Sequence, residues 1–351
     1  MPAFPSNLKA WGDRIPLTIN GSLIDTNLTD FPVLVKLNST RFDFSKARSD
    51  GYDIRFALPD GTLLKYERER HDAINQVAEY WVKIPSILTG TNKIFYLYYG
   101  NPNATDGADP TNVWDSYFSC VHHLRDYTSS QVNDSTINAL NGVKTAANEP
   151  IEVDAKIGKG QSFDGSNDKI NLGNYTPLNF GTGSFTLEAW IKLSALNLDQ
   201  IIVGKRWIIG DYEQYIFVVN SNNKLQLWTY GSGFGNESSI ISNSVLTTDT
   251  WYYVVAVRDA SSTYHRLYIN GVEDASAQLP VRNVTSDGNN WIGADNRDNI
   301  KYFHGIIDEV RQSKGIARSA AWIKASYNSG NDTLLSYGSE ELPPAFLLFF
   351  N

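Results

Sequence analysis

The 351-residue chain contains one cysteine, Cys120, one methionine, and no run of about 20 apolar residues. Because a disulfide needs two cysteines, an intrachain disulfide is excluded, and so is a zinc site made of several thiolates. The missing apolar run leaves no candidate for a membrane-spanning helix. Stability must therefore come from core packing, and the apolar neighbours of Cys120 predict that its thiol is buried.

Positive charge is also scarce, with 30 Lys and Arg residues against 38 Asp and Glu residues and a formal net charge of -8. No cluster of Lys and Arg is present, so we expect no nucleic-acid partner. The first residues, MPAFPSNLKAWGDR, lack the charged and then apolar pattern of a secretory signal. We therefore expect a chain that acts where it is made or leaves by another route, such as viral assembly followed by lysis.

Aromatic residues, by contrast, make up 13% of the chain, and they occur in short segments rich in Val, Ile and Thr. Turn-forming Asn, Gly, Asp and Pro separate these segments, which is typical of strands. We predict an all-β protein of two jelly-roll-like β-sandwich domains in tandem. The polar segment 101–115 predicts the boundary, which gives domains at 1–115 and 116–340 and an apolar tail at 341–351.

Three local patterns predict particular elements of the second domain. In residues 184–193 the alternation places Phe185, Leu187, Ala189 and Ile191 on one face of a strand, opposite Glu188 and Trp190. Asn270 and Gly271 predict a tight hairpin, because both residues tolerate positive φ. Residues 319–327 predict a helix with Ser319 as its cap.

Four segments of the second domain follow one another in a familiar order. They are FDGSNDKINLG (163–173), SFTLEAWIKL (184–193), WYYVVAVRD with LYING (251–259, 267–271), and YFHGIIDEVR with ARSAAWIKASY (302–311, 317–327). Together they resemble the laminin-G-like domains of the concanavalin A-like lectin/glucanase superfamily. The resemblance implies a concanavalin A-like sandwich and a module that binds rather than reacts.

The first domain has a resemblance of its own, carried by DGYDIRF (50–56), LLKYERE (63–69), YWVKIP (80–85) and IFYLYYGN (94–101). These segments resemble an uncharacterised bacterial β-rich domain family, which often directly precedes a laminin-G-like domain in surface and secreted proteins. The resemblance implies an architecture but no biochemical role.

Some relatives in the concanavalin A-like superfamily are glycoside hydrolases, which need two carboxylates across the scissile bond. The Glu-x-Asp-x-x-Glu pattern of its laminarinase-like members is absent from this chain. The nearest acidic residues are Glu188, Asp308 and Glu309. We expect the adjacent Asp308 and Glu309 to point to opposite faces of a strand, with Asp308 on the face of Ile306 and Val310. We therefore predict that the chain is not an enzyme, and a glycoside hydrolase stays as an alternative.

Sugar binding needs only aromatic faces for the apolar side of a pyranose and a few polar groups for its hydroxyls. Strand ends and loops between residues 207 and 291 supply both, although any single tryptophan there is equally consistent with a core position. The candidate ligand-binding residues are Trp207, Trp228, Tyr230, Phe234, Asn236 and Trp291.

Calcium is the one candidate cofactor, since some laminin-G-like relatives bind it and it takes its ligands from carboxylate and carbonyl oxygens. The candidate metal ligands are Asp164, Asp168, Asp295, Asp298 and Asp308. For Asp308, hydrogen bonding of a buried carboxylate to a loop backbone or an arginine is the alternative.

The leading hypothesis is a non-catalytic structural and binding protein of a virion surface, such as a bacteriophage decoration, fibre or tail component. It would attach to glycans or to partner proteins. A secreted or cell-surface bacterial adhesin is the alternative location. The tail LPPAFLLFFN (342–351) would promote aggregation if left in water, so we expect it to fold back or to insert into a neighbouring subunit of a homo-oligomer.

Overall fold

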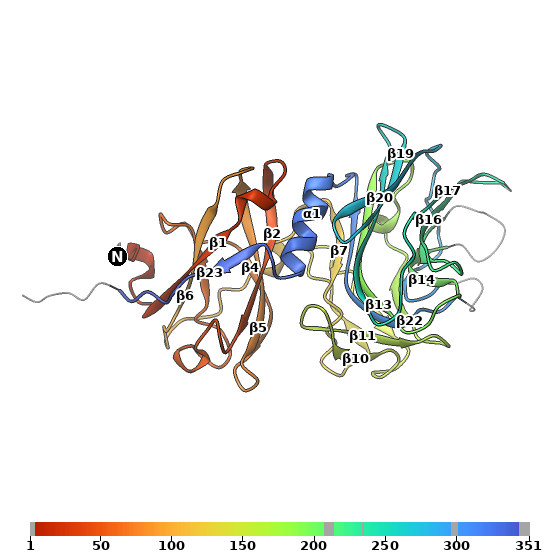
Figure 1. The fold of residues 1–351 in the computed structure, drawn as a ribbon. Helices are drawn as coiled ribbons and strands as arrows, with labels where there is room; N and C mark the ends of the chain where they lie inside the picture. Colours follow the sequence, from red (N-terminus) through yellow and green to blue (C-terminus); the bar gives the residue numbers. More distant parts are fainter. Residues whose placement is uncertain (1–3, 207–213, 234, 296–300, 344–351) are drawn as a thin grey trace, which may run out of the picture. The chain divides into compact units, whose positions relative to one another are not determined.

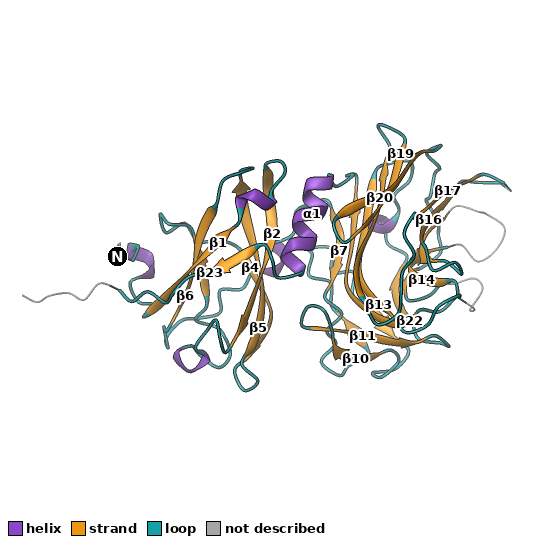
Figure 2. Ribbon diagram, viewed as in Figure 1, coloured by secondary structure: helices purple, strands orange, loops and turns teal. Residues whose placement is uncertain are grey.

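The computed structural model describes residues 4–206, 214–233, 235–295 and 301–343. The chain divides into two compact units, one of residues 1–114 with 328–351 and the other of residues 115–327. Figures 1 and 2 show that both are built mainly of strands, which confirms the all-β prediction. The sequence placed residues 328–340 in the second domain, whereas the structure assigns them to the first unit.

The first unit contains two antiparallel sheets. The four-stranded sheet has the order β23-β1-β6-β3, and the three-stranded sheet has the order β2-β5-β4. The strands are β1 (Asp13–Ile19), β2 (Leu28–Asn38), β3 (Arg55–Ala57), β4 (Tyr66–Asp72), β5 (Val77–Ile87), β6 (Lys93–Tyr99) and β23 (Leu335–Tyr337). Single turns of 3-10 helix lie at η1 (Ser6–Leu8), η2 (Gly21–Leu23), η3 (Phe44–Lys46) and η4 (Pro110–Asn112).

Strand β23 explains why the C-terminal residues belong to the first unit. It pairs antiparallel with β1, with Thr18 opposite Ser336. Beyond it, the backbone of Glu341 bonds to that of Arg14, and the Arg14 guanidinium donates through Nε to the Glu341 carboxylate at 2.7 Å. Residues 328–343, here called the return segment, therefore complete the sheet that contains β1. A three-residue strand has no periodicity from which its distant partner could be predicted.

The second unit contains two eight-stranded sheets. In the first, here called the β13 sheet, the order is β10-β11-β22-β13-β18-β19-β20, and β7 also pairs with β22. Its strands are β7 (Phe118–His122), β10 (Ile151–Asp154), β11 (Lys159–Asp164), β13 (Phe185–Leu193), β18 (Trp251–Asp259), β19 (Tyr264–Ile269), β20 (Val272–Gln278) and β22 (His304–Lys314).

The other sheet, here called the β15 sheet, has the order β17-β16-β15-β14-β21-β12-β9-β8. Its strands are β8 (Gln131–Val132), β9 (Gly142–Lys144), β12 (Ile170–Gly173), β14 (Gln200–Lys205), β15 (Gln214–Val219), β16 (Leu225–Tyr230), β17 (Glu237–Ile241) and β21 (Asn290–Ile292). The 3-10 turn η5 (Thr176–Leu178) precedes β13.

The core of the second unit lies between these sheets, as the alternation predicted. Phe185, Leu187, Ala189 and Ile191 of β13 are all buried in one cluster with the inward side chains of the β15 sheet, such as Phe217, Leu227 and Ile292. Cys120 belongs to the same cluster, which confirms its predicted burial. Burial of apolar surface at about 25 cal/mol per Å² makes this cluster the main stabilising element of the sandwich.

The predicted helix and hairpin are also confirmed. Helix α1 (Ala320–Gly330) begins after Ser319, whose hydroxyl accepts the Trp322 N–H at 3.2 Å. Asn270 and Gly271 have φ values of 52° and 80° and join β19 to β20. Among the described residues, no helix has the length and apolar character needed to cross a membrane.

One predicted alternation is wrong, because β22 contains a bulge at Glu309. Glu309 has a φ of 53°, and the register with β13 shifts so that Trp190 is opposite Asp308 and Glu188 is opposite Arg311. Val310 therefore lies in the core, whereas Asp308 lies on the outer face beside Trp190. A bulge adds a residue to one strand and reverses the alternation beyond it.

A buried basic pair lies at one end of the second unit, where Arg258 of β18 is opposite His265 of β19. Arg258 donates to the carbonyls of Gly181, Gly183 and Arg282. His265 is 1% exposed, and within the described part of the chain neither of its ring nitrogens has a hydrogen-bond partner. Burial, helped by the positive charge of Arg258, lowers the pKa of His265 to about 4.

This pair predicts a loss of stability in acid. The unfolded chain takes up a proton at His265 near its ordinary pKa of about 6.5, before the folded chain does, so stability falls between about pH 6.5 and pH 4. The full loss is about 3 kcal/mol, from a shift of about 2.5 pKa units at about 1.36 kcal/mol per unit. Urea unfolding of His265→Leu against pH should show a flatter profile than the parent. Equal slopes for His265→Leu and the parent would contradict the prediction.

Candidate functional site

One row of residues crosses the outer face of the β15 sheet. Successive strand pairs align Trp228 of β16 with Ile216 of β15, Ile216 with Gly204 of β14, and Gly204 with Trp291 of β21. We call these four residues the outer row; Figure 1 labels two of its strands, β14 and β16. Since neighbouring strands lie about 4.8 Å apart, Trp228 and Trp291 are roughly 14 Å apart across three strand spacings.

The packing of the core determines which side chains of these strands point outward and form the outer row. Tyr215 and Phe217 of β15 and Leu227 of β16 point inward and are fully buried in the core cluster. Because side chains alternate along a strand, Ile216 and Trp228 must point outward. There Ile216 packs with Ile201 and Val218 in a small separate cluster, against which the half-buried Trp228 lies.

Gly204 leaves the middle of the outer row without a side chain. A Cβ at this position would lie 3.4 Å from Ile201 and 3.6 Å from the carbonyl oxygen of Ala294, which is ordinary contact. The position is bordered by Asp295, whose carboxylate pairs with Arg206 at 2.7 Å. Gly204 is buried, so Ile201, Asp295 and the Ala294 carbonyl cover the backbone between the two tryptophans.

Each tryptophan of the row has an ammonium group over its ring. Lys301 Nζ lies 5.0 Å from the Trp228 ring centroid, and Lys169 Nζ lies 5.1 Å from that of Trp291. Such cation–π contacts contribute about 0.5–1 kcal/mol at exposed sites. The Trp291 indole N–H has no hydrogen-bond partner in the described ranges. The row thus combines two aromatic faces with several hydrogen-bond donors.

Two further predicted ligand residues lie beside the row. Tyr230 follows Trp228 on the same face of β16, with their ring centroids 6.4 Å apart. Asn236 lies in the turn after β16, where its side chain donates to the Ser232 carbonyl at 3.0 Å. Trp207 and Phe234, the other two predicted residues, lie outside the described residues. The structure therefore gathers Trp228, Tyr230 and Trp291 on one face with Asn236 at its edge.

The predicted metal ligands are held differently. Asp164 and Asp168 share the turn after β11, where Asp164 accepts the Ser166 N–H at 2.7 Å and Asp168 accepts the Asp164 N–H at 2.8 Å. The Ser166 N–H bond lowers the pKa of Asp164, whereas burial raises the pKa of Asp168. Both carboxylates thus stabilise the turn itself.

Asp295 and Asp308 have different bonding partners. Asp295 pairs with Arg206, and Asp308 accepts the Ile157 N–H at 2.8 Å, which is the hydrogen-bonded alternative expected for a buried carboxylate. Asp298 lies outside the described residues. Within the described ranges, no three of the predicted carboxylates converge as metal ligands do. The four described carboxylates are thus bound to donors of the protein itself.

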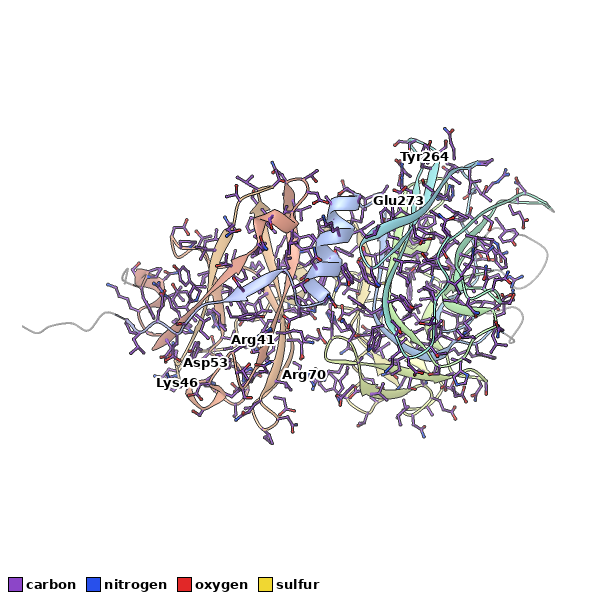
Figure 3. All side chains as sticks on the ribbon, viewed as in Figure 1. Arg41, Lys46, Asp53, Arg70, Tyr264 and Glu273 are labelled. Atoms are coloured by element: carbon purple, nitrogen blue, oxygen red, sulfur yellow. The ribbon has the colours of Figure 1, made fainter. Side chains whose placement is uncertain are left out.

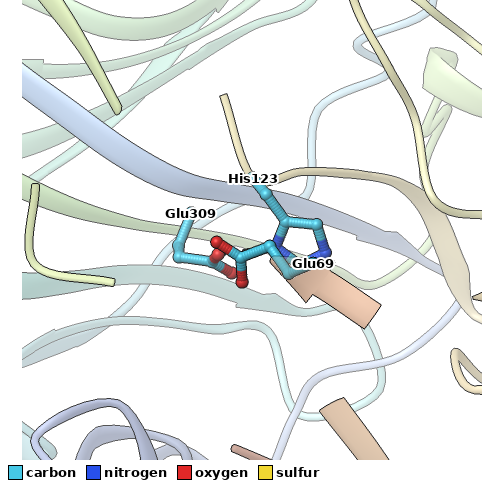
Figure 4. A group of neighbouring side chains, drawn as sticks. All are labelled: Glu69, His123 and Glu309. Atoms are coloured by element: carbon cyan, nitrogen blue, oxygen red, sulfur yellow. Dashed lines mark hydrogen bonds and ion pairs between the residues drawn. The ribbon is translucent and has the colours of Figure 1, made fainter. Parts of the chain in front are cut away.

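The outer face of the β13 sheet carries a polar network that sequence reasoning missed. His123 Nδ1 lies 2.5 Å from Glu309 Oε1, and Arg311 donates to the other Glu309 oxygen at 2.6 Å; Figure 4 draws His123 and Glu309. Burial alone would raise the pKa of Glu309, but His123 and Arg311 outweigh it and lower the pKa. The bulge at Glu309 creates this pairing, and no sequence pattern indicated the bulge.

Two family models match parts of the chain. Residues 164–324 match the concanavalin A-like lectin/glucanases superfamily, and residues 50–137 match a domain of unknown function, DUF2341. The chain thus carries these two domains in tandem, which confirms both resemblances drawn from the sequence. A search of curated proteins finds no match.

Several solved structures resemble part of the chain at low identity. The binding domain of Paraclostridial Mosquitocidal Protein 1 is 16% identical with a TM-score of 0.50, over 63% of this chain and 53% of that one, so the match spans about half of its length. Domain 4 of AbnA, a GH43 extracellular arabinanase from Geobacillus stearothermophilus, in complex with arabinotriose, is 20% identical (TM-score 0.44; 62% and 98% covered). The CBM40 of Ruminococcus gnavus IT-sialidase, bound to α2,3 sialyllactose, is 13% identical (TM-score 0.38; 41% and 82%).

A prediction about calcium follows, because four of the candidate metal ligands already bond to protein donors: Asp164, Asp168, Asp295 and Asp308. A ligand that binds only the folded state raises the unfolding midpoint. We expect calcium and a chelator to give the same midpoint in differential scanning calorimetry, because these carboxylates already accept bonds from donors of the protein. A midpoint that rises with calcium concentration and falls back with chelator would contradict this prediction.

Proposed function

We propose that the chain is a non-catalytic binding protein whose outer row attaches it to glycans. The observation that carries the proposal is the alignment of Trp228 and Trp291 in one row, on either side of a glycine and each beside an ammonium group. The concanavalin A-like superfamily match supports a carbohydrate-binding role at the level of the fold.

The chemistry of the row suits a sugar chain. The apolar side of a pyranose stacks on an indole face, while hydroxyl groups need directed donors and acceptors. Lys169 and Lys301 can donate to hydroxyl oxygens, and the Tyr230 hydroxyl can donate or accept.

The acidic residues closest to a possible hydrolytic pair, Glu188 and Glu309, bond to other side chains of the protein. Glu188 is buried, and it accepts the Tyr253 hydroxyl at 2.5 Å. Its ladder neighbour Arg311 donates to Glu309. Hydrolysis needs one protonated and one ionised carboxyl open to the sugar. This network supports a non-catalytic role, and it lies on the other sheet from the outer row.

For the setting, we propose a structural component of a virion surface, with a secreted or cell-surface bacterial adhesin as the second candidate. The order of the two domains supports a surface role, because the first domain's family resemblance associates this tandem with surface and secreted proteins. Assembly into a homo-oligomer through the apolar tail stays a prediction, since residues 344–351 lie outside the described residues.

The outer row predicts which tryptophans matter for binding. On a glycan array, the parent chain should bind a defined set of glycans, and Trp228→Ala or Trp291→Ala should each lower the affinity for the best of them by roughly tenfold, about 1.4 kcal/mol. Titration calorimetry measures the loss.

Trp251 of the β13 sheet provides the matched control, since it is also half-buried with a lysine over its ring, Lys192 at 5.4 Å. Trp251→Ala should bind as the parent does. Absence of any glycan binding, or equal losses in all three variants, would sink the proposal.

A non-catalytic role predicts that the bound glycan is recovered intact. After long incubation with the chain, mass spectrometry should find no shortened product, and Glu188→Gln should give the same spectrum as the parent. Product that forms with the parent and disappears in Glu188→Gln would establish the glycoside hydrolase alternative instead.

A further inference from the structure

The first unit contains an open pocket of about 670 Å³. Its walls are the loop of residues 39–44 after β2, the hairpin tip at Gln76, and residues 337–340 of the return segment. Pockets that hold small ligands have volumes of about 300–1,000 Å³. The pocket belongs wholly to the first unit and shares no residue with the outer row.

The return segment forms a fixed wall of this pocket. The Tyr337 hydroxyl accepts the Lys36 N–H at 3.0 Å, and the Gly338 N–H donates to the Pro16 carbonyl at 2.8 Å. A Cβ at Gly338 would lie 2.5 Å from Pro16 Cγ, so only glycine allows the segment to approach this closely. The pocket is therefore complete only when the two ends of the chain are joined in one sheet.

The charged groups of the lining have partners in the same unit. Arg41 bonds to Asp332 at 2.9 Å and lies 4.3 Å from the Tyr337 ring centroid. Glu340 pairs with Lys46 and accepts the Tyr99 hydroxyl at 2.5 Å. Figure 3 labels Arg41 and Lys46 in this unit. Arg41 and Glu340 are thus paired with opposite charges, whereas the lining carboxylate of Asp43 accepts the Ser45 N–H and hydroxyl and stays negative. The lining therefore disfavours an anionic ligand and suits one that donates hydroxyl hydrogen bonds.

The remaining groups at the mouth are hydroxyls and an amide. Ser39, Thr40, Gln76 and Ser339 are all exposed and line the pocket. Hydroxyl and amide side chains both donate and accept hydrogen bonds, which matches the alternating donors and acceptors of a polyol. The Tyr337 ring adds a partly exposed aromatic surface.

We infer that this pocket is a second ligand site of the chain, specific for a neutral hydroxylated ligand such as an uncharged oligosaccharide. It assigns a binding role to the first unit, and it does not depend on the outer row. A ligand held between the 39–44 loop and the return segment also holds β23 against β1, so ligand binding protects the C-terminal residues from removal.

The test uses the full chain carrying Trp228→Ala and Trp291→Ala, so that the outer row contributes little. Neutral trisaccharides built from glucose, galactose, mannose or N-acetylglucosamine are titrated by calorimetry. At least one of these trisaccharides should bind the double variant, and its binding should slow proteolytic cleavage after residue 328. Ser339→Trp, which fills the mouth, should lower that affinity at least tenfold. Ser86→Trp, at an exposed serine of β5, is the matched control and should change it little.

A second variant guards against misfolding. Gln76 has a φ of 55°, so Gln76→Gly suits the backbone, and it should weaken binding at an unchanged unfolding midpoint. The inference is overturned if no neutral trisaccharide binds the double variant, or if binding is equal in Ser339→Trp, Gln76→Gly and Ser86→Trp. Stronger binding of an acidic sugar or a peptide than of any neutral sugar would overturn the ligand class. If Trp228→Ala and Trp291→Ala leave array binding unchanged, the outer-row proposal fails and the inference about this pocket is unaffected.

Discussion

Packing of the inward side chains of the β15 sheet into the core is the constraint on which the proposed binding face depends. Tyr215, Phe217 and Leu227 must point inward to complete the core with the β13 sheet. Ile216 and Trp228 are then forced outward by the alternation of the strand. The antiparallel register sets their neighbours, because it aligns Trp228 with Trp291 through Gly204. The same packing that stabilises the sandwich thus places both half-buried tryptophans on the outer face.

The first unit depends on a different constraint, since its four-stranded sheet uses both ends of the chain. Residues 50–137, which match DUF2341, contain β3, β4, β5 and β6 but not β1, β2 or β23. The concanavalin A-like unit is therefore inserted between two parts of the first unit. Contacts such as Arg14 with Glu341 tie the two parts together. This arrangement gives the return segment a role in the pocket as well as in the sheet.

Much of the fold could be predicted from the sequence, because strand alternation and turn chemistry are local. The inward residues of β13, the Asn270–Gly271 hairpin and the Ser319 cap all follow from neighbouring residues. The Glu309 bulge and the pairing of β23 with β1 could not, since each is decided by a distant partner strand. For the candidate site, the sequence indicated Trp228, Tyr230 and Trp291 as aromatic candidates. Their alignment across Gly204 depends on strand register, which no local pattern reveals.

Hydroxyl-radical footprinting of the chain saturated with its best glycan tests whether the outer row is the glycan-binding face, because it reports the solvent accessibility of individual tryptophans. We expect the ligand to protect Trp228 and Trp291 from oxidation, while Trp251 on the β13 sheet is oxidised as in the free chain. Protection of Trp251, or unchanged oxidation of both Trp228 and Trp291 at saturation, would contradict the outer row as the glycan-binding face.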